Sequence, residues 1–253
     1  MKVLFYPDKV VSFARIRVIF QIMGWEIIED INKDFDIIFY WNVETVNKPD
    51  NVILRLSEDY HIINLGCNDV SKENVTGIYE RIFGNTLEIN PEKYTGRAVA
   101  KTNLGQGDKS GKIANCPCRK KEGWHYQKLL QDISDGQISE FRVFVVDKVI
   151  AVNEKRKRID NRFQTIVEKN EYKLINEVFT YDEVQKINEF CKEIGAKYCE
   201  LDILRDKELY IIDVNNISGI GSFEKNNKEI YNKTNQQISE ALNDKASKIL
   251  KGC

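Results

Sequence analysis

Two apolar segments in the last quarter of the chain most restrict the folds open to it. Residues 199–204 and 209–214 are strand-length runs built mainly from Leu, Ile, Val and Tyr, and the polar segment 205–208 separates them. Such a pair predicts an antiparallel β-hairpin, because a short polar connection joins two neighbouring strands. A second pair, 141–146 and 149–152, flanks Asp147 and Lys148 and predicts a tighter hairpin. We therefore expect strand pairs joined by short turns in the second half of the chain.

Polar side chains interrupt the apolar pattern of the 199–214 hairpin. Asp213 and Asn215 are two residues apart and so lie on one face of their strand, and Asp202 lies on the partner strand. Two carboxylates and an amide oxygen are ligands that a hard divalent cation such as Mg²⁺ takes. Asp and Asn also cap turns at strand ends. The hairpin by itself leaves both interpretations open.

The rest of the chain mixes strand and helix signals. Strands are predicted at 2–6, 25–29, 35–41, 51–56 and 97–102. A helix is predicted at 12–23, with Ser12 as its N-cap and Gly24 as its end, and another from Ser71 to Gly84. Apolar spacing predicts a further helix at 181–194, and the polar remainder predicts a terminal helix. The expected fold class is α/β, with α+β character.

Charge and composition exclude several classes of protein. The chain has 38 Lys and Arg against 39 Asp and Glu, so no global field recruits nucleic acid or an acidic membrane. No apolar run approaches the ~18 residues needed to cross a bilayer, and the N-terminus becomes charged at Asp8, too early for a signal peptide. The six cysteines show no CxxC spacing, so reduced thiols are expected. We therefore expect a soluble, cytoplasmic protein.

The middle of the chain is locally basic. Residues 101–170 carry 15 Lys and Arg against 9 Asp and Glu. They include a Gly-containing segment, 101–112, and the cationic run 155–158. This composition suits a polyanion such as a nucleoside triphosphate, although a charge run can also be a solvated face.

The order of these features resembles the ATP-grasp superfamily. Its members close their nucleotide site with a hairpin that carries Asp and, on the second strand, Asp or Glu, any residue and Asn; here these are Asp202 and Asp213-Val-Asn215. The resemblance implies an ATP-grasp fold with a short N-terminal Rossmann-like preATP-grasp domain. It implies a preATP-grasp domain at 1–66, a small ATP-grasp subdomain with the phosphate loop at 67–126, and a large subdomain with the metal-binding hairpin at 127–253.

The resemblance also implies phosphate-binding residues. Lys101 corresponds to the lysine that reaches the α- and β-phosphates, and Lys72 to a second phosphate lysine. Segment 105–111 corresponds to the loop that folds over the phosphates. Arg142 corresponds to the arginine that acts on the γ-phosphate, and Arg156 is favoured for a similar role from the run 155–158.

Adenine and metal contacts follow from the same resemblance. Segment 127–130 resembles the interdomain hinge, in which the carbonyl of Lys128, the N–H of Leu130 and the side chain of Gln127 would contact adenine. The cofactors implied are ATP and Mg²⁺. The residues implied to hold the magnesium and its nucleotide are Asp202, Asp213 and Asn215.

The family resemblance implies a ligase that forms an amide from a carboxylate and an amine, or joins a thiol, through an acylphosphate with release of ADP and phosphate. Two alternatives stay open: a phosphotransferase acting on a small-molecule or sugar acceptor, and a non-catalytic nucleotide-sensing module. Expected partners are small-molecule or carrier-linked carboxylates and amines, with no nucleic acid and no membrane. The small N-terminal domain also suggests a homo-oligomer that completes the substrate site.

Overall fold

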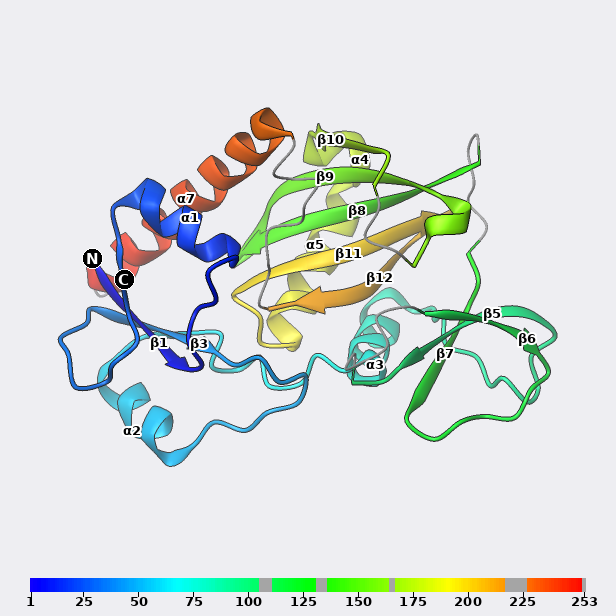
Figure 1. The fold of residues 1–253 in the computed structure, drawn as a ribbon, viewed down its shortest axis with the longest axis horizontal. Helices are drawn as coiled ribbons and strands as arrows, with labels where there is room; N and C mark the ends of the chain where they lie inside the picture. Colours follow the sequence, from blue (N-terminus) through cyan, green and yellow to red (C-terminus); the bar gives the residue numbers. More distant parts are fainter. Residues whose placement is uncertain (105–110, 131–135, 164–166, 217–226, 252–253) are drawn as a thin grey trace.

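A computed structural model describes residues 1–104, 111–130, 136–163, 167–216 and 227–251 of the chain, except for the side chain of Asn161. In these ranges the strands form three sheets, of four, three and five strands, that follow one another along the sequence (Figure 1). Within the described ranges, no helix combines the length and the apolar character needed to cross a membrane.

The N-terminal sheet is parallel, with strand order β2-β1-β3-β4. Its strands are β1 (Lys2–Pro7), β2 (Glu26–Ile28), β3 (Ile37–Trp41) and β4 (Ile62–Ile63). Helix α1 (Arg15–Met23) lies on one side, begins after Ala14 rather than Ser12, and ends at Gly24 in the left-handed conformation. Phe5, Phe20 and Phe39 pack their rings between α1 and the sheet. This packing joins the predicted helix to the predicted strands.

The strand predicted at 51–56 is wrong, because this segment is the helix α2 (Asn51–Asp59). Asp50 caps it by accepting hydrogen bonds from the backbone N–H groups of Val52 and Ile53. Ile53 is fully buried, whereas Val52 and Leu54 are exposed. A short apolar run does not distinguish a strand from a helix, and here the capping aspartate decides in favour of the helix.

The small sheet is antiparallel, with order β6-β5-β7. Its strands are β5 (Gly96–Thr102), β6 (Lys112–Cys116) and β7 (Trp124–Lys128). Helix α3 (Lys72–Phe83) precedes it, begins after the N-cap Ser71 and ends at Gly84, as predicted. The first residue of α3 donates its backbone N–H to the carbonyl of Asn103, just after β5. This contact places the N-terminus of α3 beside the end of β5.

The large sheet is antiparallel, with order β10-β9-β8-β11-β12. Its strands are β8 (Gln137–Val146), β9 (Lys148–Arg158), β10 (Lys169–Lys173), β11 (Tyr198–Asp206) and β12 (Glu208–Asn215). Both predicted hairpins are present, as β8–β9 and β11–β12. Each hairpin turns at one residue with positive φ, Asp147 in β8–β9 and Lys207 in β11–β12. The connection of the β11–β12 hairpin is therefore shorter than the four-residue segment 205–208 that the sequence predicts. Short helices η1 (Ile159–Asn161) and α4 (Ile175–Val178) flank β10.

Helices cover the two faces of the large sheet differently. Helix α5 (Tyr181–Glu193) and α3 pack on one face against residues such as Val143 and Leu201. Helix α7 (Lys228–Leu250) and α1 pack on the other face, against Phe144 and Tyr198 (Figure 1). On that second face Arg142 lies two residues before Phe144 on β8, opposite Asp202 of β11. The charged residues described below therefore begin where the apolar packing of α1 and α7 ends.

Candidate functional site

Strand register brings three of the predicted site residues together on one face of the large sheet. Arg142 of β8 lies opposite Asp202 of β11, and Asp202 lies opposite Asp213 of β12. Directly opposed residues in antiparallel strands have neighbouring side chains on the same face. Asn215 adds a hydrogen bond from its Nδ2 to Asp202 Oδ2, at 3.4 Å. The hairpin therefore gathers the predicted metal ligands beside the predicted catalytic arginine.

Arg142 and Asp202 form a bidentate ion pair. Arg142 donates from Nε and Nη2 to the two carboxylate oxygens of Asp202, at 2.7 and 2.9 Å. Burial disfavours the charge on Arg142, but Asp202 and Glu200 more than compensate and raise the pKa of its guanidinium well above the usual value. Burial likewise opposes the charge on Asp202, and the cations Arg142 and Lys155 outweigh it and lower the pKa of that carboxyl. Both groups are therefore charged at neutral pH.

The cationic run 155–158 alternates between the two faces of β9. Lys155 Nζ lies 3.7 Å from Glu140 Oε1 and 3.8 Å from Asp202 Oδ1. Lys157 Nζ donates to Glu140 Oε2 at 2.9 Å. Arg156 points to the opposite face and donates to Glu154 at 3.1 Å. The structure therefore does not bring Arg156 to the site; Lys155 and Lys157 face Asp202 instead, because successive residues of a strand point to opposite faces.

Two lysines approach Asp213 from the small-sheet side. Lys72, the first residue of α3, donates from Nζ to Asp213 Oδ1 in an ion pair. Lys101, near the end of β5, is partly buried. Burial lowers the pKa of Lys101, and the negative charge of Asp213 opposes that shift. Both predicted phosphate lysines thus lie at the edge of the site where α3 and β5 meet the β11–β12 hairpin.

His125 lies beside this lysine but within the packed interior. It pairs across β5 and β7 with Lys101, and its Nε2 lies 3.1 Å from Thr76 Oγ1. Burial, helped by the charges of Lys101 and Lys120, lowers the pKa of His125 to about 4. The imidazole is therefore neutral at pH 7 and contributes no charge to the site.

The oxygen atoms near Asp202 suit a hard cation. Asp202, Asp213 and Asn215 offer two carboxylates and one amide oxygen, the donor types that Mg²⁺ and Ca²⁺ prefer. In the part of the chain that the structure describes, no three His, Cys, Asp or Glu side chains form a metal-binding group. A cation at this position would therefore need oxygens from a bound ligand as well. Mg²⁺ commonly binds in this way, through one or two carboxylates and substrate phosphates.

The predicted adenine hinge occupies the end of β7. Gln127 is buried, at 5% exposure. The N–H of Lys128 donates to the carbonyl of Leu87, and the carbonyl of Leu130 accepts from Arg162 Nη2 at 3.1 Å. These two bonds use the Lys128 N–H and the Leu130 carbonyl. The groups assigned to adenine are the other two, the Lys128 carbonyl and the Leu130 N–H. The hinge assignment stays a prediction.

The predicted phosphate loop 105–111 lies outside the described residues except for Gly111. A Cβ atom at Gly111 would lie 2.9 Å from the ring of Phe163 and 3.3 Å from Lys101 Cγ. Only a residue without a side chain fits between these two groups without displacing them. Gly111, directly before β6, therefore lies close to Lys101.

The sequence did not reveal two buried charged residues behind the site. Glu200 and Arg15 are each 1% exposed. Glu200 Oε2 accepts from Arg142 Nη1 at 3.0 Å, and its Oε1 accepts from Arg15 Nε at 2.8 Å. Glu200 could have been found, because it lies two residues before Asp202 and so shares its face. Nothing in the sequence links Arg15 to a residue 185 positions later.

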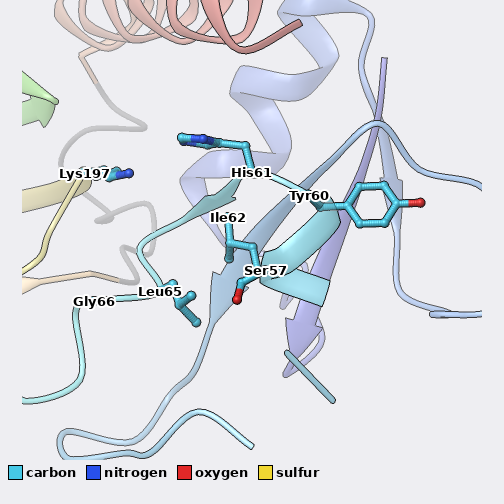
Figure 2. A pocket seen from close by; sticks show the side chains of 7 residues that line it. All are labelled: Ser57, Tyr60, His61, Ile62, Leu65, Gly66 and Lys197. Atoms are coloured by element: carbon cyan, nitrogen blue, oxygen red, sulfur yellow. The ribbon is translucent and has the colours of Figure 1, made fainter. Parts of the chain in front are cut away.

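A hollow of about 240 Å³ lies away from these residues, between α2, β4 and the segment before β11 (Figure 2). The residues that line it are Ser57, Tyr60, His61, Ile62, Leu65, Gly66 and Lys197. Figure 2 shows the His61 ring and the Tyr60 ring extending in opposite directions, so these polar groups do not converge on one point. None of the lining residues belongs to the predicted site.

Comparison with known proteins gives no match to a family model and none to a curated protein. Solved structures do match. A RiPP-associated ATP-grasp ligase from Chryseobacterium gregarium, in complex with ADP and a leader and core peptide, is 15% identical. The match covers 96% of this chain and 97% of that chain, with a TM-score of 0.57.

Two further structures are similar over most of their length. The ATP-grasp ligase PsnB, complexed with a phosphomimetic variant of its minimal precursor, Mg and ADP, is 11% identical over 88% of this chain and 92% of that chain (TM-score 0.56). In a further PsnB complex the match spans only 62% of that chain. The macrocyclase MdnC from Microcystis aeruginosa MRC, bound with precursor peptide MdnA, is 11% identical over 95% of this chain and 98% of that chain (TM-score 0.54). At such identities the likeness concerns the fold, and the chain has the ATP-grasp fold that its sequence predicted.

Proposed function

We propose that this chain is an ATP-dependent ligase that joins a carboxylate to an amine and releases ADP and phosphate. One observation carries the proposal: cationic side chains from α3, β5, β8 and β9 converge on the two aspartates of the β11–β12 hairpin. These cations are Lys72, Lys101, Arg142 and Lys155. Phosphoryl transfer needs little covalent chemistry from a protein and depends on charges that neutralise the transferred group. A cationic cluster beside carboxylates is suited to that task.

The proposed cofactors are ATP and Mg²⁺. PsnB is complexed with Mg and ADP, and the Chryseobacterium gregarium ligase with ADP. In this chain Asp202, Asp213 and Asn215 would hold the magnesium ion, which supplies positive charge that neutralises the phosphate oxygens. Lys72 and Lys101 would bind the phosphates from the small-sheet side. The register of β9 supports Lys155 and Lys157, rather than Arg156, as further phosphate ligands.

The proposed reaction has two steps. The γ-phosphoryl group of ATP moves to a carboxylate oxygen of the acid, so that ADP leaves and an acylphosphate forms. The amine nitrogen then attacks the acyl carbon, phosphate leaves with one former carboxylate oxygen, and the amine loses a proton to solvent. Arg142 is proposed to stabilise the charge on the transferred phosphoryl oxygens, because a fixed guanidinium costs no reorganisation in the transition state.

The proposed acid is carried on a peptide. Among the structures that share the fold, the Chryseobacterium gregarium ligase holds a leader and core peptide and MdnC holds a precursor peptide. An aspartate or glutamate side chain of a peptide would supply the carboxylate.

Isotope transfer tests the proposal directly. The purified protein would be incubated with MgATP, an amine, and pooled peptides whose acidic side chains carry ¹⁸O. We expect ADP and phosphate in equal amounts, with ¹⁸O in the phosphate, because an acylphosphate gives one carboxylate oxygen to the leaving phosphate. ADP formation without phosphate would support a phosphotransferase instead. Tight nucleotide binding with no turnover of any acceptor would support a sensing module.

A further inference from the structure

The arginine assigned to the phosphates is held from behind by a buried chain of charges. Arg142 Nη1 donates to Glu200 Oε2 at 3.0 Å, on the side away from Asp202. The other carboxylate oxygen of Glu200 accepts from Arg15 Nε at 2.8 Å. Arg15 is the first residue of α1, and it joins the N-terminal helix to the C-terminal hairpin. Cation and anion therefore alternate from Arg15 through Glu200 and Arg142 to Asp202.

The surroundings of Arg15 fix its orientation. Its guanidinium carbon lies 5.1 Å from the centre of the Phe144 ring and 5.6 Å from the centre of the Tyr231 ring. Arg15 Nη1 also donates to Asn235 Oδ1 of α7 at 3.0 Å. A planar guanidinium close to two aromatic rings, with directed hydrogen bonds at its edge, has little freedom to rotate. Helices α1 and α7 therefore hold this cation in one place.

Charge balance explains why the placement of Arg15 matters for Arg142. A buried carboxylate such as Glu200 needs nearby cations, because isolated charge is costly away from water. Here Arg15 and Arg142 each satisfy one of its oxygens. Without Arg15, Glu200 would draw more strongly on Arg142. The guanidinium would then lose its two-point alignment on Asp202.

We infer that Arg15 is a positioning residue, which acts through Glu200 to fix the Arg142 guanidinium in its bidentate orientation on Asp202. The phosphate-binding consequence of this inference rests on the proposed function, since only there does Arg142 contact a nucleotide. The orientation of Arg142 does not depend on any nucleotide. The orientation of Arg142 and its effect on nucleotide binding are therefore measured separately.

The first experiment reads the orientation of Arg142 by NMR. The arginine Nε–H signals of the ¹⁵N-labelled protein would be recorded, and the Arg142 signal assigned by its loss in Arg142→Lys. In Arg15→Met we expect this signal to move or broaden, because its hydrogen bond to Asp202 changes. Arg17→Met is the matched control: Arg17 lies two residues along the same helix and pairs with Glu29 at 3.1 Å, and Glu29 also accepts from the backbone N–H of Val10. An unchanged Arg142 signal in Arg15→Met would overturn the inference.

The second experiment compares two nucleotides by calorimetry. In Arg15→Met we expect the affinity for Mg-AMPPNP to fall by about tenfold, while the affinity for Mg-ADP changes by less than about twofold, because Arg142 is assigned to the γ-phosphate. Arg15→Lys keeps the positive charge but not the planar guanidinium with its several donors, so it should give an intermediate loss of affinity for Mg-AMPPNP. A general structural defect would weaken both nucleotides equally, and that result would contradict the positioning role.

If Arg15→Met does not fold, Arg15→Lys and Glu200→Gln alter the same contacts with smaller changes in volume. The NMR and calorimetry measurements on these variants then decide whether Arg15 positions Arg142. If the wild-type protein binds neither nucleotide, the proposed function fails. The Arg142 signal then decides the role of Arg15 alone.

Discussion

His125 makes the stability of this protein depend on pH in a way that the structure quantifies. The side chain is 5% exposed and lies between β5, β7 and α3. In the unfolded chain it takes up a proton near its ordinary pKa of 6.5, whereas in the folded state burial lowers the pKa to about 4. Between these values the unfolded state binds a proton that the folded state does not. Acid therefore favours unfolding, and the stability is complete above pH 6.5 and is lost as the pH falls.

The magnitude follows from the two pKa values. Between pH 7.5 and pH 5, a histidine with these values should lower the free energy of unfolding by about 2 kcal/mol. His125→Gln removes the titrating group but keeps a polar side chain for Thr76 Oγ1, 3.1 Å from the ring nitrogen. We expect the wild-type free energy of unfolding to fall by about 2 kcal/mol more than that of the variant over this pH range.

Urea unfolding at the two pH values, followed by circular dichroism, measures this difference. His61 is the other histidine of the chain and is exposed; partial burial and the charges of Lys197 and Lys245 lower its pKa as well, so His61→Gln serves as the comparison for the buried His125. It should keep most of the wild-type pH dependence. A direct NMR titration of the His125 ring should give a pKa near 4. Equal pH dependence in wild type and His125→Gln, or a ring that titrates near 6.5, would refute the reasoning.

Three substitutions test other parts of the structure. Asp213→Asn should lower magnesium-dependent nucleotide binding by about tenfold or more, and calorimetry with unchanged affinity would remove Asp213 from the site. Lys155→Met should weaken Mg-AMPPNP by about tenfold while Arg156→Met changes it by less than about twofold; the reverse order would show that the register of β9 is misassigned. Gly195→Ala should destabilise the fold by about 3 kcal/mol, because φ is +78° and the new Cβ would lie 2.2 Å from the carbonyl oxygen of Gly66. Urea unfolding of this variant with wild-type stability would contradict that estimate.

Local patterns in the sequence predicted most of the elements that build the site. The hairpin at 199–214 could be found because its two apolar runs flank a polar turn, and the structure confirms it as β11 and β12. The helix from Ser71 to Gly84 could be found because both of its ends carry capping residues. The strand predicted at 51–56 is wrong because a short apolar run fits a strand and a helix equally well, and here the N-cap Asp50 favours the helix. In these examples, the elements whose ends are marked by a capping residue or a polar turn are the ones that the sequence identifies.

The choice among the cations of β9 could not be made from the sequence. A strand has a period of two, so moving the register by one residue exchanges the buried and the exposed sets. Register here depends on β8, which pairs Lys155 with Glu140 and Arg156 with Ser139. That pairing is a contact between strands, and composition carries no information about it. The same holds for Arg15, whose partner Glu200 lies at the other end of the chain.

The balance of charge around Asp202 relates the site to its proposed ligand. Within the ranges that the structure describes, six cationic side chains contact or lie near four carboxylates there. The cations are Arg15, Lys72, Lys101, Arg142, Lys155 and Lys157, and the carboxylates are Glu140, Glu200, Asp202 and Asp213. This cluster has an excess of two positive charges, and a magnesium-bound nucleoside triphosphate has a net charge of about −2 at neutral pH. Binding such a ligand would balance the charges of these described side chains, whereas a cationic ligand would add to them.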